Sequence, residues 1–331
     1  MPKTEMRYGR VPGVDKPISR IVQGMIQVPS GSAEAEAKGF ALLDAALEAG
    51  ITAVDTAHVY GSKDALLGRW INSRGVREQV VVLAKGAHHN MVRKRVTPFD
   101  IAGDLHDTLA RMQTEYIDLY VLHRDDPSYP VEPIVDVLNQ YVREGKIRAF
   151  GGSNWTTRRL QAANDYAAAS GQIPFAISSP NFSLADQKRE PWQGCVTISG
   201  PNNASERQWY ADHQMPLFTW SSMAGGFLSG RITRENRKTF TEGPDRLAVN
   251  CYGEEDNFQR LDRAQEVAAR KGLSLPQVAL AYVLHYPLDL YALVGSATPE
   301  EIQANVAALN TSLAPQEMAY LDLRADTLEG E

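Results

Sequence analysis

Four residues of types used in proton transfer, Asp55, Tyr60, Lys85 and His123, lie at or just beyond the ends of short apolar runs. Each run has the length and composition of a buried parallel strand. The carboxyl ends of parallel strands open on one face of a sheet or barrel, so these side chains are expected to converge. A carboxylate, a phenol, an ammonium and an imidazole together suit the donation of a proton to a carbonyl oxygen.

The chemistry assigns a different task to each of the four groups. A tyrosine hydroxyl has an ordinary pKa near 10, and an adjacent ammonium such as that of Lys85 lowers it. Asp55 would keep Lys85 charged and in place, and His123 would orient the substrate oxygen. Because no side chain carries hydride, this chemistry also requires a nicotinamide cofactor.

Helix and strand signals alternate along the chain, which predicts a parallel sheet. The expected strands cover residues 21–28, 51–54, 80–84, 117–122, 147–150, 175–177, 217–220 and 291–294. Eight strands fit a closed (β/α)8 TIM barrel, class α/β, in which residues 1–331 form one domain. A hairpin over residues 6–20 is expected to cap the barrel floor. Between the last two strands, an insertion should hold a polar loop at 231–250 and two helices at 255–270 and 275–286.

Composition excludes several classes of protein. With 43% hydrophobic and 22% charged residues, the chain resembles an ordinary globular protein and no membrane protein. A net charge of -6 argues against a nucleic-acid partner. The first residues lack the apolar core of a secretory signal, which favours a cytoplasmic location. Cys195 and Cys251 are too few for a disulfide framework and lack metal-ligand spacing. The expected partner is a small molecule, and an oligomer is compatible with the sequence.

Several segments together resemble the signature of the aldo-keto reductase family. They are GITAVDTAHVYG at 50–61, LYVLH at 119–123, GKIRAFGGSN at 145–154 and GGFLSGR at 225–231, in the family's order. The resemblance covers nearly the whole chain. It implies that Asp55, Tyr60, Lys85 and His123 form the catalytic tetrad of an enzyme that reduces an aldehyde or ketone to an alcohol, with Tyr60 as the general acid.

The resemblance also implies a cofactor site. Ser153 and Asn154 would bind the nicotinamide carboxamide, Trp220 would stack on the ring, and the loop from Ser221 to Arg231 would cover the pyrophosphate. The motif at 295–305 would hold the adenosine end, with Asn305 on adenine. The full set is Met25, Ser153, Asn154, Ser179, Trp220, Ser221, Ser222, Met223, Ala224, Gly225, Arg231, Gly295, Ser296, Ala297, Thr298, Glu301 and Asn305.

Three positions depart from the family pattern. Glu301 stands where many NADPH-dependent members carry an arginine for the 2'-phosphate, and a carboxylate there would repel phosphate. Gly295 replaces a lysine found in some members. Ser179 replaces a glutamine that often contacts the carboxamide. We expect NADP(H) as the cofactor on the family pattern and on Ser296, with NAD(H) as the alternative.

Polar residues near the tetrad predict a sugar-like or polyhydroxylated substrate, because hydroxyl specificity comes from polar groups that the wrong ligand leaves unpaired. The candidates are His58, His88, His89, Arg124 and Asp125, with Met25 and Asp126 beside them. An apolar substrate would instead favour a more aromatic rim.

Two other functions compete with this interpretation. Histidines at strand ends also occur in metal-dependent barrel hydrolases, but Tyr60 and Lys85 would then have no task, and we expect no metal site. A catalytically silent cofactor-sensing or scaffold protein would keep the barrel without turnover. The intact tetrad favours the enzyme.

Overall fold

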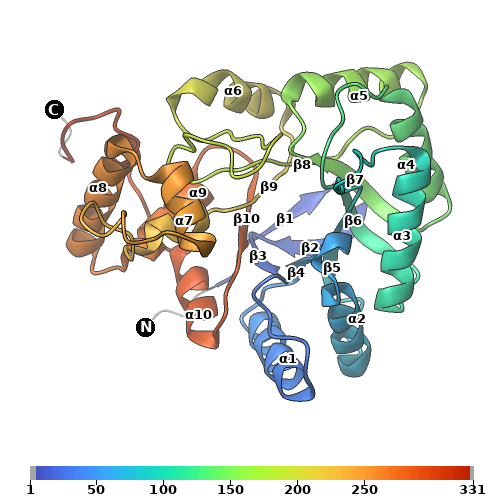
Figure 1. Cartoon of the computed structure of the whole chain (residues 1–331), viewed down its shortest axis with the longest axis horizontal. Helices are drawn as coiled ribbons and strands as arrows, with labels where there is room; N and C mark the ends of the chain where they lie inside the picture. The colour runs from blue at the N-terminus through green and yellow to red at the C-terminus, as the bar shows by residue number, and fades with distance from the viewer. Residues whose placement is uncertain (1–4, 329–331) are drawn as a thin grey trace.

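The computed structural model describes residues 5–328, in which eight parallel strands close into a barrel (Figure 1). Around the barrel the strand order is β10-β3-β4-β5-β6-β7-β8-β9. The strands are β3 (Ile21–Gly24), β4 (Ala53–Asp55), β5 (Val81–Gly86), β6 (Ile117–Leu122), β7 (Ile147–Ser153), β8 (Ile177–Ser179), β9 (Leu217–Thr219) and β10 (Leu290–Val294). The expected TIM barrel is therefore confirmed.

Helices cover the outside of the barrel. They are α1 (Ala33–Glu48), α2 (Lys63–Arg74), α3 (Pro98–Met112), α4 (Glu132–Arg143), α5 (Thr157–Ala169), α6 (Ala204–His213), α7 (Gly243–Tyr252), α8 (Glu255–Lys271), α9 (Leu275–His285), α10 (Pro299–Ala308) and α11 (Pro315–Leu321). Helix α3 begins with a capping box: the Thr97 side chain accepts from the backbone N–H of Asp100, and the Asp100 carboxylate accepts from that of Thr97. None of the described helices is both long and apolar enough to span a bilayer.

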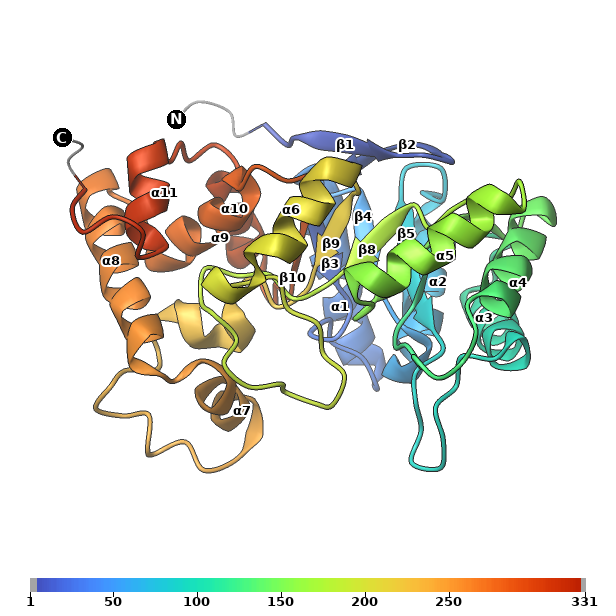
Figure 2. The same cartoon turned by 90° about the horizontal axis from the view of Figure 1, so that it is seen from above.

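A short antiparallel hairpin, β1 (Tyr8–Val11) and β2 (Val14–Ser19), lies across one end of the barrel (Figure 2). Its apolar residues Val11, Val14 and Ile18 pack into the same cluster as the barrel interior. The Lys16 ammonium lies 3.0 Å from a carboxylate oxygen of Asp118 on β6, which fixes the hairpin from outside. As expected, the hairpin closes the end at which the barrel strands begin.

The barrel interior explains how the reactive side chains come together. Successive side chains of a strand point to opposite faces, so residues two apart share a face. The apolar interior includes Ala53 of β4, Leu83 of β5 and Val121 of β6. Two residues further along the chain stand Asp55, Lys85 and His123. The same step leads from Ile177 to Ser179 and from Phe218 to Trp220, and two such steps lead from Ala149 to Ser153.

Several boundaries differ from the sequence predictions. Strand β3 ends at Gly24, whereas 21–28 was predicted, and β7 continues to Ser153, whereas 147–150 was predicted. Strand β8 covers Ile177–Ser179, whereas 175–177 was predicted, because the small buried hydroxyls of Ser178 and Ser179 continue the strand after the apolar run ends. The insertion between β9 and β10 holds α8 and α9 as predicted. The supposed polar loop at 231–250, however, contains most of α7, which buries Ala248, Cys251 and Tyr252 at helical spacing.

Candidate active site

Asp55 and Lys85 form a buried ion pair at the carboxyl ends of β4 and β5. The side chains are 7% and 3% exposed, and the Lys85 ammonium donates to Asp55 Oδ1. Burial raises the pKa of Asp55, and the Lys85 ammonium opposes this effect. The pair is positioned by the sheet, where Asp55 is in register with Leu83 and Lys85 with Val121.

Tyr60 and His123 complete the group. Tyr60 lies on a single 3-10 turn, His58–Tyr60, which follows β4 and brings the phenol back over the barrel mouth. Its ring centroid is 5.7 Å from Lys85 Nζ and 5.8 Å from the His123 ring, which it meets edge-on. His123 directly follows β6, and its backbone N–H donates to Gly86 O at 2.7 Å. The structure thus brings all four predicted residues together.

The protonation states suit donation of a proton by the tyrosine. Burial raises the pKa of Tyr60, Asp55 raises it further, and Arg124 opposes them. The net direction is therefore a raised pKa, whereas the sequence analysis expected a lowering by Lys85, whose ammonium donates to Asp55 in the structure. Burial also holds the pKa of His123 well below its usual range, with contributions from Lys85 and Arg124, so its imidazole is neutral at neutral pH.

A profile of the aldo/keto reductase family matches residues 20–323. The chain belongs to the aldo/keto reductase family. It is 26% identical to the aryl-alcohol dehydrogenase [NADP(+)] of Phanerodontia chrysosporium, over 97% of this chain and 87% of that protein. It is 28% identical to the aldo-keto reductase YhdN of Bacillus subtilis, over 78% of this chain and 75% of that protein.

The solved structure of a thermostable aldo-keto reductase, Tm1743, in complex with the inhibitor epalrestat has the same fold. It superposes with a TM-score of 0.72 at 21% identity, covering 97% of this chain and all of the other. The expected NAD(P)-dependent oxidoreductase is confirmed at the level of the family, and the match does not favour a barrel hydrolase. Among residues 5–328, no three histidine, cysteine or acidic side chains gather into a possible metal site.

The residues expected to bind the carboxamide lie together at the ends of β7 and β8. Ser153 Oγ donates to Ser179 O at 2.9 Å, and Asn154 Nδ2 donates to Ser153 Oγ at 3.2 Å. Asn154 has a φ of 59°, which turns the chain sharply after β7. The Ser179 hydroxyl and the Trp220 indole N–H are buried without a partner among the described residues. Unpaired buried polar atoms are rare, so they fit a site for a polar ligand.

Trp220 has a neighbour that the sequence reasoning missed. Trp192, from the loop between β8 and α6, stacks on Trp220 with ring centroids 5.3 Å apart and 28° between the planes. Trp192 is 40% exposed and lies at the rim of the mouth. Its position in a long loop that follows a barrel strand was the available signal. The rim is therefore more aromatic than the sequence analysis expected.

The predicted pyrophosphate loop has an unusual backbone. Ser221, Ala224, Gly225 and Gly226 all have positive φ, between 51° and 95°. The turns are held from within the loop, since the backbone N–H of Ala224 donates to Ser221 O at 2.7 Å and that of Gly226 donates to Met223 O at 3.0 Å. Ser222 is buried, with Oγ donating to Thr219 O at 3.2 Å. Within the same loop, Met223 is half-buried and packs against the core.

Arg231, at the end of this loop, is ion-paired with Asp245 of α7. The pair ties the loop to the insertion, so α7 takes part in holding the predicted cofactor cover. This helix was missing from the sequence prediction, and so was its link to the loop.

The segment expected at the adenosine end is compact. Asn305 Nδ2 donates to Ser296 Oγ at 3.0 Å, and Thr298 caps α10 by accepting from Glu301 N at 3.2 Å. Glu301 Oε2 accepts from the backbone N–H of Ala297 at 2.7 Å. A phosphate at this helix start would therefore compete with the Glu301 carboxylate for the same N–H group. Gly295 is exposed, and a Cβ added there would meet only Gln27 Cγ, at 3.2 Å.

The predicted substrate residues divide into two groups. His58 is engaged by α3, since its Nε2 lies 2.7 Å from Asp107 Oδ2 and its Nδ1 lies 3.6 Å from Asp104 Oδ1. Asp125 is likewise engaged elsewhere, with Arg159 at 3.1 Å. Both positions satisfy local ion pairs, a role that the sequence alone does not distinguish from substrate binding.

His88, His89, Arg124 and Met25 do lie around the tetrad. The His88 ring meets the His123 ring at 4.8 Å, and Arg124 directly follows His123. Burial lowers the pKa of both His88 and His89. Met25 is fully buried, and its backbone N–H donates to Asp55 O at 2.9 Å.

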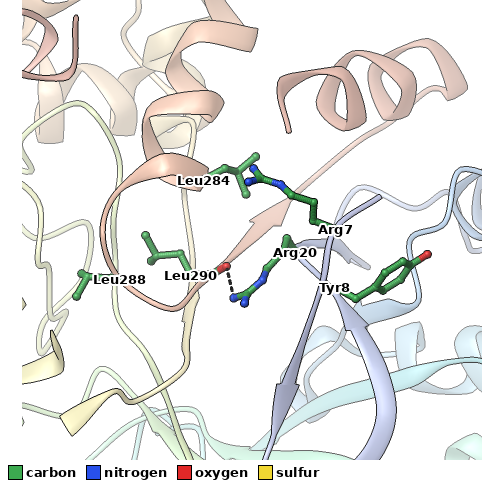
Figure 3. A pocket seen from close by; sticks show the side chains of 6 residues that line it. All are labelled: Arg7, Tyr8, Arg20, Leu284, Leu288 and Leu290. Atoms are coloured by element: carbon green, nitrogen blue, oxygen red, sulfur yellow. Dashed lines mark hydrogen bonds between the residues drawn. The ribbon is translucent and has the colours of Figure 1, made fainter. Parts of the chain in front are cut away.

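A separate pocket opens at the other end of the barrel, beside the hairpin (Figure 3). Arg7 and Arg20 extend toward the side that carries Leu284 and Leu290, whereas the Tyr8 side chain points away and donates to Gly50 O at 3.0 Å. Arg20 is ion-paired with Asp289 and donates to Leu290 O at 3.1 Å, which ties β3 to β10. Because the reactive residues lie at the opposite ends of the strands, we assign this pocket a structural role.

Proposed function

We propose that this protein reversibly reduces an aldehyde or ketone to the alcohol with NADPH, and that Asp55, Tyr60, Lys85 and His123 carry the proton chemistry. The buried Asp55–Lys85 pair beside the Tyr60 ring is the observation that supports this most directly. When bound, the nicotinamide supplies hydride to the carbonyl carbon.

The chain's own residues handle the proton. Tyr60 donates its hydroxyl proton to the carbonyl oxygen and becomes a phenolate. The Lys85 ammonium, held charged by Asp55, stabilises that phenolate at the moment it forms. Neutral His123 donates a hydrogen bond that orients the carbonyl oxygen toward Tyr60. In the reverse direction the phenolate accepts the proton of the alcohol.

The cofactor assignment has its own support. The buried unpaired atoms of Ser179 and Trp220 suit the nicotinamide end. The loop from Ser221 to Arg231, which the Arg231–Asp245 pair ties to α7, is the proposed cover of the pyrophosphate. The related aryl-alcohol dehydrogenase is named for NADP(+), which favours NADP(H) here too. Glu301 opposes the 2'-phosphate, so NAD(H) is the competing outcome.

Two substrate classes follow from the mouth. The polar groups of His88, His89 and Arg124 support a polyhydroxylated carbonyl compound. The stacked Trp192 and Trp220 support an aromatic aldehyde, in line with the name of the related aryl-alcohol dehydrogenase. We therefore test both classes.

The decisive assay follows NADPH and NADH consumption at 340 nm with a panel of sugar and aromatic aldehydes. Turnover with NADPH, lost in Tyr60→Phe, is the expected result. A clear preference for NADH would refute the cofactor assignment. Full activity of Tyr60→Phe would refute the assignment of the acid.

We also propose a cytoplasmic location and one folding unit over residues 1–331. Cell fractionation tests the first. Limited proteolysis tests the second: a stable, separately folded fragment would contradict it.

A further inference from the structure

Arg124 is a buried cation that forms no ion pair with an acidic side chain among the described residues. Its residue is 7% exposed, and within residues 5–328 its guanidinium makes one hydrogen bond, from Nη1 to His123 O at 3.4 Å. Its Cζ also lies 4.8 Å from the centre of the Trp192 ring. A guanidinium carries five N–H donors, so most of its hydrogen-bonding capacity is unused.

The carboxylates that follow Arg124 do not compensate its charge. Asp125 pairs with Arg159 at 3.1 Å, and Asp126 pairs with Lys94 at 3.0 Å. Leaving a buried charge unpaired is costly, and such groups are normally paired with an opposite charge. The arrangement therefore leaves one positive charge open at the mouth of the barrel.

The guanidinium lies at the mouth of the barrel. Its Nη1 donates to His123 O, and its Cζ lies over the Trp192 ring, which itself stacks on Trp220 just after β9. Its Nε and Nη2 are not sealed within the protein, in contrast to Nε of Arg260, which is buried with no partner. A ligand that enters the mouth can therefore reach them.

We propose that Arg124 binds a carboxylate carried by the substrate, so that the preferred substrate is an aromatic or short aliphatic aldehyde with a carboxylate at its other end. This rests on the proposed carbonyl reduction. A planar guanidinium matches a carboxylate with two parallel hydrogen bonds and balances its single charge. A phosphate dianion would keep an excess charge. Trp192 covers the guanidinium and supplies an aromatic face for the rest of the ligand.

A purely structural role for Arg124 makes a different prediction. If Arg124 only holds the loop of Trp192, its loss would affect charged and neutral substrates alike. If it binds the carboxylate, its loss would affect the charged substrate selectively. The ratio of kcat/KM between matched charged and neutral aldehydes separates the two roles.

The experiment compares para-formylbenzoate with its methyl ester, and succinic semialdehyde with butanal, for the full-length protein. We expect the wild type to favour each carboxylate. Arg124→Gln should lower the charged-to-neutral ratio of kcat/KM by about 10- to 100-fold, the usual effect of losing hydrogen bonds to a charged group. Arg124→Lys should recover part of the ratio. Arg158→Gln is the matched control, because Arg158 is an exposed arginine in the first turn of α5, and it should leave the ratio unchanged.

Several outcomes would overturn the inference. An unchanged ratio in Arg124→Gln, or an equal loss for both members of a pair, would assign Arg124 a packing role. If the carboxylate compounds still inhibit Arg124→Gln, their carboxylate group binds at Tyr60 and His123 instead.

Failure of the proposed function is recognised separately, because then the neutral aldehydes are not reduced either. In that event tryptophan fluorescence reports para-formylbenzoate binding near Trp192. At least about tenfold weaker binding in Arg124→Gln would still support the carboxylate site, and equal binding would refute it.

Discussion

The buried Asp55–Lys85 pair makes a sharp prediction about stability. Replacing Lys85 with Met leaves the Asp55 carboxylate 7% exposed and without the only side-chain partner it has in the described residues. Removing one member of a buried pair typically costs about 3–5 kcal/mol, because an uncompensated charge stays buried. We therefore expect Lys85→Met to lower the free energy of unfolding by about 3–5 kcal/mol at neutral pH.

The double variant Asp55→Asn/Lys85→Met removes both charges at once. Replacement of a whole buried pair is often close to neutral, so the double variant should be more stable than Lys85→Met alone. The matched control is Lys38→Met, which breaks the exposed pair Lys38–Glu34, whose side chains are 67% and 81% exposed. This control should cost about 0.5 kcal/mol or less.

The cost of Lys85→Met should also depend on pH. Burial already raises the pKa of Asp55, and without Lys85 nothing opposes that shift. A carboxyl with a raised pKa in the folded state binds its proton before the unfolded chain does as pH falls. The stability difference from wild type should therefore shrink on acidification toward about pH 5, by about 1.4 kcal/mol for each unit of raised pKa.

Urea unfolding followed by tryptophan fluorescence, with equal m-values as a check, measures these differences. If the loss in free energy of unfolding in the double variant equals the sum of the losses in the two single variants, Asp55 and Lys85 are not coupled. If Lys85→Met loses as little free energy of unfolding as Lys38→Met, the Asp55–Lys85 pair is not buried.

Three further predictions concern the proposed reaction. Tyr60→Phe should lower kcat for reduction by at least about 100-fold, as expected for a lost general acid, while the Kd for NADPH measured by fluorescence stays the same; retained turnover would contradict it. Because burial raises the pKa of Tyr60, the reduction rate should stay level from about pH 6 to pH 9, whereas alcohol oxidation, which needs the phenolate, should rise with pH. A loss of reduction centred near neutral pH would exclude Tyr60 as the acid. Glu301→Gln should tighten NADPH binding by up to about fivefold and leave NADH binding unchanged, since it removes a carboxylate from the start of α10; equal effects on both would place the 2'-phosphate elsewhere.

The alternation of side chains made much of the barrel predictable. Each short apolar run before Asp55, Lys85 or His123 marks a strand. The alternation of side chains along that strand also shows which face the reactive residue shares, so the sequence predicts both the strands and the convergence of the three side chains. The same logic misplaced β8, because it ended the strand where the apolar residues end. Ser178 and Ser179 continue the strand: Ser178 Oγ is buried with a partner, Tyr210 Oη at 2.9 Å, whereas the buried Ser179 hydroxyl has none among the described residues.

Other features depend on contacts between distant segments. Helix α7 is short and polar, and its burial against the loop before it was visible only in the spacing of Ala248, Cys251 and Tyr252. His58 and Asp125 are polar residues beside the tetrad in sequence, yet each is engaged by an ion pair with another element. No local pattern reports which of several nearby charges a side chain will meet.

The electrostatics of the mouth show why those pairings matter for function. Three acidic groups near the tetrad, Asp55, Asp125 and Asp126, are each paired with a different cation. Arg124 is left as the cation without an acidic partner beside the reacting groups, and its charge helps to keep His123 neutral. The neutral imidazole of His123 and the guanidinium of Arg124 therefore both offer hydrogen-bond donors to a ligand in the mouth. A substrate with an acceptor at each end, a carbonyl and a carboxylate, would be the ligand that satisfies both.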